Sequence, residues 1–335
     1  MIQSAIARAV LRDDVPRELA RASMDEILDG EATPAQIGAL AVALRMKGET
    51  PEEIAGMAEA MRARVPPIRT KRTPLIDTCG TGGDNAGTFN ISTASAIVAA
   101  SCGVAVAKHG NRAVSSRTGS ADVLEVLGVR LDLTPESAAR SLDALGITFL
   151  FAPNYHAALR HANGPRREIA VRTVFNLLGP LTNPAGATRQ LLGVYADKLV
   201  RPIAEVLHML GSERAWVVHG LDGLDELTVL DHTHVAELNR GEIREFEVDP
   251  ATLGLKHADR RGLAGGDAAV NAAKIRSVLA GEPGPARDVV VLNAGAALVV
   301  AGLAKNLEEG VTRVRESIDR GLAAQKLAGL AGFRD

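Results

Sequence analysis

Apolar residues recur at helical spacing through about the first 70 residues of the chain. Two helix starts are visible there, because Thr33-Pro34 and Thr50-Pro51 each place a cap residue before a proline at the first helical position. Between these starts the apolar positions lie three and four residues apart, at Ile37, Leu40, Ala41, Ala43 and Leu44. We therefore predict a helical region over residues 1–70 that contains no strand.

From residue 75 onward, short β-rich apolar runs alternate with helical stretches, which predicts an α/β domain with a largely parallel sheet. The candidate strands are Ile147–Ala152, Gln190–Val194, Ala215–His219, Thr228–Leu230 and Ile243–Val248. The candidate helices are Lys198–Leu210, Ala268–Ala280, Arg287–Ala301 and Leu307–Leu327. The long polar segment Asn154–Arg189 interrupts the alternation, and the proline-rich segment Pro66–Pro74 is a predicted linker.

Two polar, glycine-rich loops, Gly80–Thr93 and Lys108–Ser120, flank an apolar segment. A strand-like run at residues 74–76 precedes the first loop, and the alanine-rich stretch Ser92–Ala100 follows it as a predicted helix. Glycine lets backbone N–H groups approach an anion, and the N-terminus of a helix attracts one. Two such loops predict a ligand with more than one phosphate group.

The second loop gathers cationic and hydroxyl side chains that suit phosphate oxygens. Residues 105–107 lead into it as a predicted strand, and Asp122–Leu127 follows as a predicted amphipathic helix. The first loop fits neither common phosphate motif, since Asn85 replaces the glycine of a dinucleotide loop and Thr88 the lysine of a P-loop. A sharp turn without a ligand and a solvated basic loop stay open as alternatives.

Composition and charge exclude several classes of function. The net charge of −2 gives no overall basic field for nucleic acid, and aromatic residues make up 3% of the chain. Cys79 and Cys102 have neither metal-site nor disulfide spacing and suit a reducing cytoplasm. We expect no signal peptide, and no apolar run reaches the ~20 residues of a membrane helix. Neither nucleic acid nor a membrane is an expected partner.

The loop motifs resemble those of the anthranilate phosphoribosyltransferase family. Motifs of the family occur in its order at Gly80–Asp84 (GTGGD), Thr88–Thr93 (TFNIST), Lys108–Ser116 (KHGNRAVSS) and Gly119–Glu125 (GSADVLE). The stretches Arg166–Pro184 and Asp222–Leu227 are also similar to the family, and the likeness runs from about residue 5 to about residue 330. Two departures are Cys79, in place of a branched apolar residue, and Ala170, in place of the usual glycine.

The resemblance implies transfer of the phosphoribosyl group from phosphoribosyl pyrophosphate to the amine of anthranilate, with release of pyrophosphate. It implies a small helical domain over residues 1–72, joined by part of residues 154–189, and an α/β domain over residues 73–335. The active site then lies in the cleft between the domains. The resemblance also implies a homodimer formed through the small domains.

The resemblance assigns site residues one by one. The implied phosphoribosyl-pyrophosphate contacts are Gly80, Gly83, Asp84, Thr88, Asn90, Ile91, Ser92, Thr93, Lys108, His109, Gly110, Asn111, Arg112, Ala113, Val114, Ser115, Ser116 and Ser120. The implied anthranilate contacts are Gly80, Asn111 and Arg166. Mg²⁺ is the implied cofactor, with Ser92, Asp225 and Glu226 as its candidate ligands, because Mg²⁺ prefers oxygen. No residue is assigned as general base.

Structural roles stay open for several of these residues. Asp225-Glu226 also fits a solvated turn, Arg166-Arg167 a solvated helix start after Pro165, and His109 a residue that shapes the loop. Two rival functions are a pyrimidine nucleoside phosphorylase, which shares the related fold, and a catalytically silent relative that binds nucleic acid. The second rival needs a basic stripe and lost acidic ligands, neither of which fits this chain.

Overall fold

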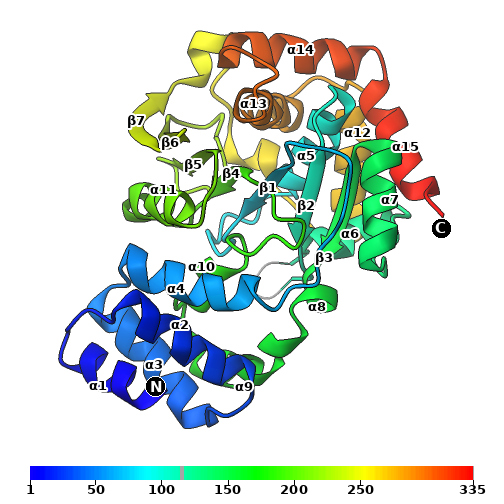
Figure 1. Ribbon diagram of the computed structural model, residues 1–335. Coiled ribbons are helices and arrows are strands. Elements are labelled where there is room, and N and C mark those ends of the chain that lie inside the picture. The colour runs from blue at the N-terminus through cyan, green and yellow to red at the C-terminus, as the bar shows by residue number, and fades with distance from the viewer. Residues whose placement is uncertain (114–116, 335) are drawn as a thin grey trace.

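The computed structural model describes residues 1–113 and 117–334, and it shows a helical unit at one end and an α/β unit at the other (Figure 1). The chain opens with α1 (Ile2–Val10), α2 (Arg17–Leu28), α3 (Pro34–Lys47) and α4 (Pro51–Arg62). Both predicted helix starts are confirmed, since Thr33 and Thr50 each form a capping box at the start of α3 and α4. In the described residues the first strand begins only at Ile76.

A seven-stranded sheet in the order β3-β2-β1-β4-β5-β6-β7 forms the centre of the α/β unit. Its strands are β1 (Ile76–Gly80), β2 (Val106–Gly110), β3 (Ile147–Phe151), β4 (Arg189–Gly193), β5 (Arg214–Gly220), β6 (Thr233–Asn239) and β7 (Glu242–Val248). The strands from β3 to β5 in this order pair in parallel, whereas β6 and β7 are antiparallel. The predicted α/β class with a largely parallel sheet is therefore confirmed.

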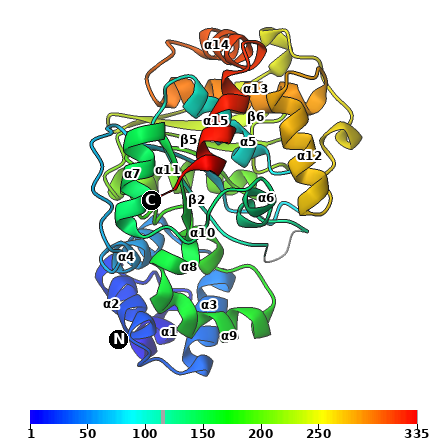
Figure 2. The same cartoon turned by 90° about the vertical axis from the view of Figure 1, so that its right-hand side faces the viewer.

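Helices cover both faces of this sheet (Figures 1 and 2). The helices after α4 are α5 (Ile91–Ser101), α6 (Ser120–Val126), α7 (Pro135–Leu145), α8 (Ala152–Tyr155), α9 (Arg160–Ile169), α10 (Phe175–Leu178), α11 (Val200–Met209), α12 (Ala268–Leu279), α13 (Pro285–Val300), α14 (Leu307–Asp319) and α15 (Leu322–Gly332), and not all of them lie on the sheet. Short 3₁₀ turns lie at Ala157–Leu159, Asp197–Leu199, Pro250–Leu253 and Arg260–Leu263. Among the described helices, none has the length and apolar character that a membrane span requires.

Two large apolar cores lie on opposite faces of the sheet, because successive residues of a strand point to opposite sides. In β4, Leu191 packs in the core that also holds α5 and α13, whereas Leu192 packs in the core that also holds α11. The second core continues into the helical unit through buried residues of α4 such as Ile54 and Met57. The helical unit is thus attached to the sheet through a shared apolar core.

The segment between β3 and β4 returns to the helical unit. Its helix α9 packs against α2 and α3, and the buried Ala162 belongs to their core. Ala170 ends α9 in a left-handed conformation with φ of 48°. Glycine adopts this conformation at little cost, which is the physical reason why a glycine is favoured at this position.

The first residues of α4 bury a carboxylate, so the cap of this helix is important for stability. Glu53 accepts hydrogen bonds from the backbone N–H groups of Thr50 (2.8 Å) and Val15 (2.7 Å), and its own N–H donates to the Thr50 hydroxyl. We expect Thr50→Ala to lower the free energy of unfolding by about 1 kcal/mol because this acceptor is lost. Urea unfolding measures the change. Thr312→Ala on the exposed side of α14 is the control, and an equal effect of the two changes would contradict the prediction.

Two predicted elements are wrong. Thr228–Leu230 is not a strand, and the strand of this region is β6, in which polar residues such as His234 and Glu237 interrupt the apolar pattern. Leu307–Leu327 is not one helix, because Gly321 has φ of 73° and separates α14 from α15. The strands before the two glycine-rich loops also extend further than predicted, through Gly80 and Gly110.

Candidate functional site

The first glycine-rich loop begins at the carboxyl end of β1 and lies over Asp225. Gly82 N donates to Asp225 Oδ2 at 2.7 Å, and Thr81 N donates to Gly193 O at 2.9 Å. A Cβ atom on Gly80 would collide with the Asp225 carboxylate, and one on Gly193 with the Asp225 backbone. Glycine is therefore required at both strand ends for the loop to approach this carboxylate.

Asp225, Glu226 and Asp84 form an acidic cluster at this edge of the sheet. Burial and the charges of Asp84 and Glu226 raise the pKa of Asp225 well above its usual range. Burial also raises the pKa of Glu226 to about 7, although the nearby Lys108 opposes the shift. No ion pair among the described residues neutralises these carboxylates. Asp225 is 9% exposed and Glu226 is half-buried, so the interpretation of this pair as a solvated turn is wrong.

Lys108 brings a positive charge to the same edge from β2. The side chain is buried, and Nζ donates to Thr78 O at 2.5 Å and to Ser92 Oγ at 3.4 Å. Ser92 lies in the first turn of α5, and its backbone N–H donates to Glu226 Oε1 at 3.1 Å. A cation, the N-terminus of a helix and a carboxylate therefore meet around Ser92.

A buried aspartate below this site joins β1 to β2. Asp77 accepts from His109 N at 3.1 Å and from Asn183 Nδ2 at 2.8 Å, and burial raises its pKa. Asn183 Nδ2 also donates to Ala107 O at 2.8 Å. The sequence analysis missed Asp77, although a charged residue directly after the apolar run Leu75-Ile76 was a signal that marked it.

His109 lies in β2 and not in the loop, and its ring faces that of His156 with the ring centres 5.1 Å apart. Burial, together with the neighbouring His156, lowers the pKa of His109 to about 3, and burial lowers the pKa of His156 to about 4. Both rings are therefore neutral and weakly basic near pH 7, which argues against a general base at either position. A cavity of about 200 Å³ beside His156, between α4 and α8, lies away from the glycine-rich loops.

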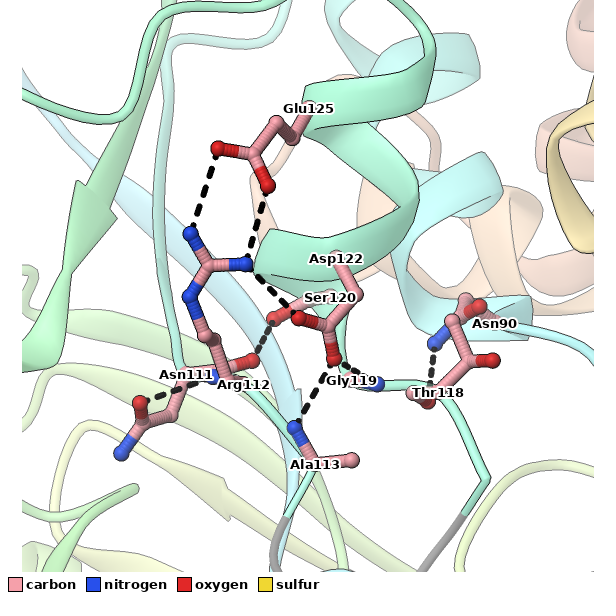
Figure 3. A network of polar contacts seen from close by, with 9 residues as sticks. All are labelled: Asn90, Asn111, Arg112, Ala113, Thr118, Gly119, Ser120, Asp122 and Glu125. Carbon is pink, nitrogen blue, oxygen red and sulfur yellow. Dashed lines mark hydrogen bonds and ion pairs between the residues drawn. The ribbon is translucent and has the colours of Figure 1, made fainter. Parts of the chain in front are cut away.

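Side chains from the first turns of α6 hold the second loop (Figure 3). Asp122 Oδ2 accepts from Ala113 N at 3.0 Å and from Gly119 N at 2.9 Å. Arg112 Nη1 lies 2.9 Å from both Asp122 and Glu125, so its charge is directed at α6. Ser120 Oγ donates to Asn111 O at 3.2 Å. The polar groups of this loop are thus organised by α6.

A closed circuit of hydrogen bonds ties both loops to α12. Asn90 Nδ2 donates to Thr118 O at 3.1 Å (Figure 3), and Asn271 Nδ2 donates to Asn90 Oδ1 at 2.9 Å. Gly266 completes the circuit, since its N–H donates to Asn271 Oδ1 at 2.8 Å and its carbonyl accepts from Thr118 Oγ1 at 2.9 Å. Asn271 is 2% exposed. Sequence reasoning missed it because its partners are distant along the chain.

Arg166 lies in the last turn of α9, where it is half-buried. The alternative of a solvated helix start after Pro165 is wrong, because α9 begins at Arg160 and Pro165 lies inside it. The guanidinium carbon of Arg166 is 5.6 Å from the centre of the Phe175 ring, and burial lowers the pKa of the guanidinium. No carboxylate among the described residues lies within 4.0 Å of it. Such a cation suits a carboxylate ligand.

The other predicted residues lie along the same two loops. From the end of β1 into α5 these are Gly80, Gly83, Asp84, Thr88, Asn90, Ile91, Ser92 and Thr93, and from β2 to α6 they are Lys108, His109, Gly110, Asn111, Arg112, Ala113 and Ser120. The side chains of Ile91 and Thr93 are each 1% exposed, so only their backbone groups are available to a ligand. Val114, Ser115 and Ser116 lie outside the described residues.

Comparisons with known proteins point to the same family over nearly the whole chain. The family model "Glycosyl transferase family, helical bundle domain" matches residues 3–65, and "Glycosyl transferase family, a/b domain" matches residues 72–324. The anthranilate phosphoribosyltransferase of Brevibacillus brevis is 55% identical over 98% of this chain and 96% of its own length. That of Moorella thermoacetica is 52% identical over 99% of this chain and 98% of its own.

Solved structures of the same enzyme are similar to this one. The structure from Thermus thermophilus has a TM-score of 0.92 and 47% identity, and the match covers 98% of each chain. The structure from Saccharomyces cerevisiae in complex with phosphoribosyl pyrophosphate and Mg has a TM-score of 0.90 and 25% identity, and the match covers 98% of this chain and 96% of that one.

Proposed function

The chain belongs to the anthranilate phosphoribosyltransferase family, and on that premise we propose how its residues divide the work of the reaction. The protein transfers the 5-phosphoribosyl group from phosphoribosyl pyrophosphate to the amine of anthranilate, in tryptophan biosynthesis. The products are N-(5-phosphoribosyl)-anthranilate and pyrophosphate. The observation that carries this function is the meeting of two glycine-rich loops, Lys108 and the pair Asp225-Glu226 at one edge of the sheet.

We propose that the Gly80–Thr93 loop and Lys108 bind the pyrophosphate group. As the amine nitrogen bonds to the anomeric carbon, the bond from that carbon to the pyrophosphate oxygen breaks. Negative charge therefore develops on the leaving pyrophosphate, and fixed N–H groups and cations stabilise it. Thr78 O and Ser92 Oγ hold Lys108 Nζ in place, so its charge is oriented in the absence of substrate.

We propose that Mg²⁺ binds at Asp225 and Glu226. Buried carboxylates that crowd together without an ion pair among the described residues favour a cation, and the Saccharomyces cerevisiae relative was solved with Mg. The described residues contain no group of three or more His, Cys, Asp or Glu side chains that holds a metal. Asp225 and Glu226 would supply carboxylate oxygens, which are ligands that Mg²⁺ prefers. A Mg²⁺ ion held by these residues would supply positive charge next to the leaving pyrophosphate.

We propose that Arg166 and Asn111 orient the carboxylate of anthranilate. The amine of anthranilate is neutral near pH 7, so it attacks without prior removal of a proton by a strong base, and we assign no general base. Orientation of the two substrates is therefore the main contribution on the acceptor side, and it is worth several kcal/mol in such reactions. The half-buried guanidinium of Arg166 supports this assignment.

We expect Asn271→Ala to raise the KM for phosphoribosyl pyrophosphate by roughly tenfold. Asn271 accepts from Gly266 N and donates to Asn90 Oδ1, so its loss leaves these two groups unpaired at a cost of about 1–3 kcal/mol. Because Asn90 and Gly266 both bond to Thr118, the change also loosens the second loop. Steady-state kinetics measure the change. The control is Asn306→Ala, which removes the cap of α14 and contacts neither loop. If the KM of Asn271→Ala for phosphoribosyl pyrophosphate equals that of the control, Asn271 has no role in positioning the loops.

We propose that the active protein has a small helical domain over residues 1–72, which part of residues 154–189 completes, and an α/β domain over residues 73–335. The packing of α9 against α2 and α3 supports this division, and so does the match of separate family models to the two parts. The active site then lies where the two domains meet. If limited proteolysis released residues 1–72 without α9, this division into domains would be contradicted.

We propose that the protein is a homodimer formed through the small domains. Among residues 1–72, four large apolar side chains are exposed, namely Met1, Val10, Leu11 and Met46, and the helices α1 and α3 that carry or border them pack together. Exposed apolar groups that gather in one place mark an interaction surface. Sedimentation at micromolar concentration is expected to show a dimer, and a monomer would contradict the proposal.

We also propose a cytoplasmic location, which the free thiols of Cys79 and Cys102 support.

A substrate panel tests the function. The protein is incubated with anthranilate and phosphoribosyl pyrophosphate, or with thymidine or uridine and inorganic phosphate. We expect turnover only with the first pair. Phosphorolysis of a nucleoside without consumption of anthranilate would replace this function by that of a pyrimidine nucleoside phosphorylase.

A further inference from the structure

Arg172 lies between α9 and α10 and packs against the first glycine-rich loop. Its Nη2 is 3.5 Å from Asn85 Oδ1, and its guanidinium carbon is 4.8 Å from the centre of the Tyr195 ring. A Cβ atom on Gly83 would lie 2.6 Å from that guanidinium carbon. The guanidinium therefore rests directly on the bare backbone of Gly83.

The charge of Arg172 is not neutralised. Among the described residues no carboxylate lies within 4.0 Å of its guanidinium, although the side chain is half-buried. A guanidinium carries five N–H donors, and the long contact with Asn85 engages at most one of them. A partly desolvated cation with unused donors is stabilised when an anion binds to it.

The backbone beside Arg172 is also open to an anion. Gly82, Gly83 and Asn85 have positive φ values of 65°, 80° and 57°. The N–H groups of Gly83, Asp84 and Asn85 have no hydrogen-bond acceptor among the described residues. Successive free N–H groups in such a conformation form a concave anion site. The guanidinium and these N–H groups thus offer donors on the same stretch of the loop.

We propose that Arg172 is a further phosphate-binding residue of this protein, which binds the pyrophosphate group together with the free N–H groups of Gly83–Asn85. The identity of the ligand rests on the proposed function, whereas the site itself rests on the contacts of Arg172. Lys108 contacts the end of the same loop at Ser92, so two cations serve its two ends. Arg172 also connects this loop to the segment that carries Arg166.

Inorganic pyrophosphate in the presence of Mg²⁺ is the probe, because its binding requires no anthranilate. Calorimetry on the full chain is expected to show that Arg172→Gln weakens binding by about tenfold to a hundredfold, the usual effect of losing a charge-assisted hydrogen bond. Arg172→Lys is expected to recover part of the affinity, since an ammonium keeps the charge but lacks the planar fork. Arg21→Gln, exposed on α2, is the control that removes the same charge, and its affinity is expected to match the wild type.

Kinetics separate binding from a structural role. Arg172→Gln is expected to raise the KM for phosphoribosyl pyrophosphate by a similar factor and to leave the KM for anthranilate unchanged. Unchanged pyrophosphate affinity in folded Arg172→Gln overturns the proposal, whether or not kcat falls. Should Arg172→Gln not fold, Arg172→Lys decides, since wild-type affinity in that variant overturns the proposal and reduced affinity supports it. Failure of the proposed function gives a different result from failure of the Arg172 proposal. If the function is wrong, the wild-type protein consumes no anthranilate, whatever its affinity for pyrophosphate.

Discussion

Replacing Asp225 and Glu226 together by Asn and Gln is expected to lower kcat/KM on the order of a hundredfold to a thousandfold, the effect of losing one preorganised electrostatic contact. The new side chains keep their size and an oxygen acceptor, so the hydrogen bonds from Gly82 N and Ser92 N can persist. What is lost is the negative charge that a hard cation prefers. The magnesium concentration for half-maximal rate is therefore expected to rise, and initial rates across a magnesium titration measure it.

Asp231→Asn is the matched control for this change. Asp231 is exposed in the same connection between β5 and β6, and its loss is expected to leave the magnesium dependence unaltered. A folded double variant with wild-type magnesium dependence would remove Asp225 and Glu226 from the metal site. Circular dichroism of the double variant is needed first, because Asp225 is buried and contacts the loop backbone.

Arg166→Ala is expected to raise the KM for anthranilate by roughly tenfold to a hundredfold and to change the KM for phosphoribosyl pyrophosphate little. The loss of a charge-assisted contact to a carboxylate costs ~1.5–3 kcal/mol. Arg166 stacks on Phe175 and has no acidic partner among the described residues, so its charge is available to a ligand. Arg166→Lys is expected to recover only part of the affinity, because an ammonium lacks the planar fork.

The two KM values, compared in the wild type and both variants, decide the role of Arg166. Equal rises in the two values would make Arg166 a structural residue. A rise confined to the KM for phosphoribosyl pyrophosphate would contradict the proposal that the glycine-rich loops bind phosphate whereas Arg166 binds the acceptor. Arg167→Ala is the control, since Arg167 is the exposed neighbour in α9.

The parts of the fold with strong local signals were predictable from the sequence. Thr33-Pro34 and Thr50-Pro51 begin helices through contacts within a few residues, so the caps mark α3 and α4 directly. The short run Thr228–Leu230 has the composition of a strand but is not one. The backbone N–H groups of Thr228 and Leu230 donate to the hydroxyls of Thr233 and Thr228, so side chains occupy these donors in place of a neighbouring strand.

The residues of the candidate site also differ in how readily the sequence reveals them. The glycine-rich loops and Lys108 were visible because their residue types and order mark a phosphate site, whereas Asp225-Glu226 was assigned through the family resemblance. Asn271 and Arg172 were not, because their contacts with Asn90 and Gly83 join positions far apart in the chain. Arg112 was visible as a cation, but only the structure shows that Asp122 and Glu125 pair with it.

The fluorescence of anthranilate, followed during incubation with the purified full-length protein and phosphoribosyl pyrophosphate, tests the phosphoribosyl transfer most directly. We predict that the fluorescence falls only when protein and phosphoribosyl pyrophosphate are both present, and that removal of magnesium by a chelator slows the fall strongly. Constant fluorescence with folded protein, magnesium and saturating amounts of both substrates would contradict the assignment.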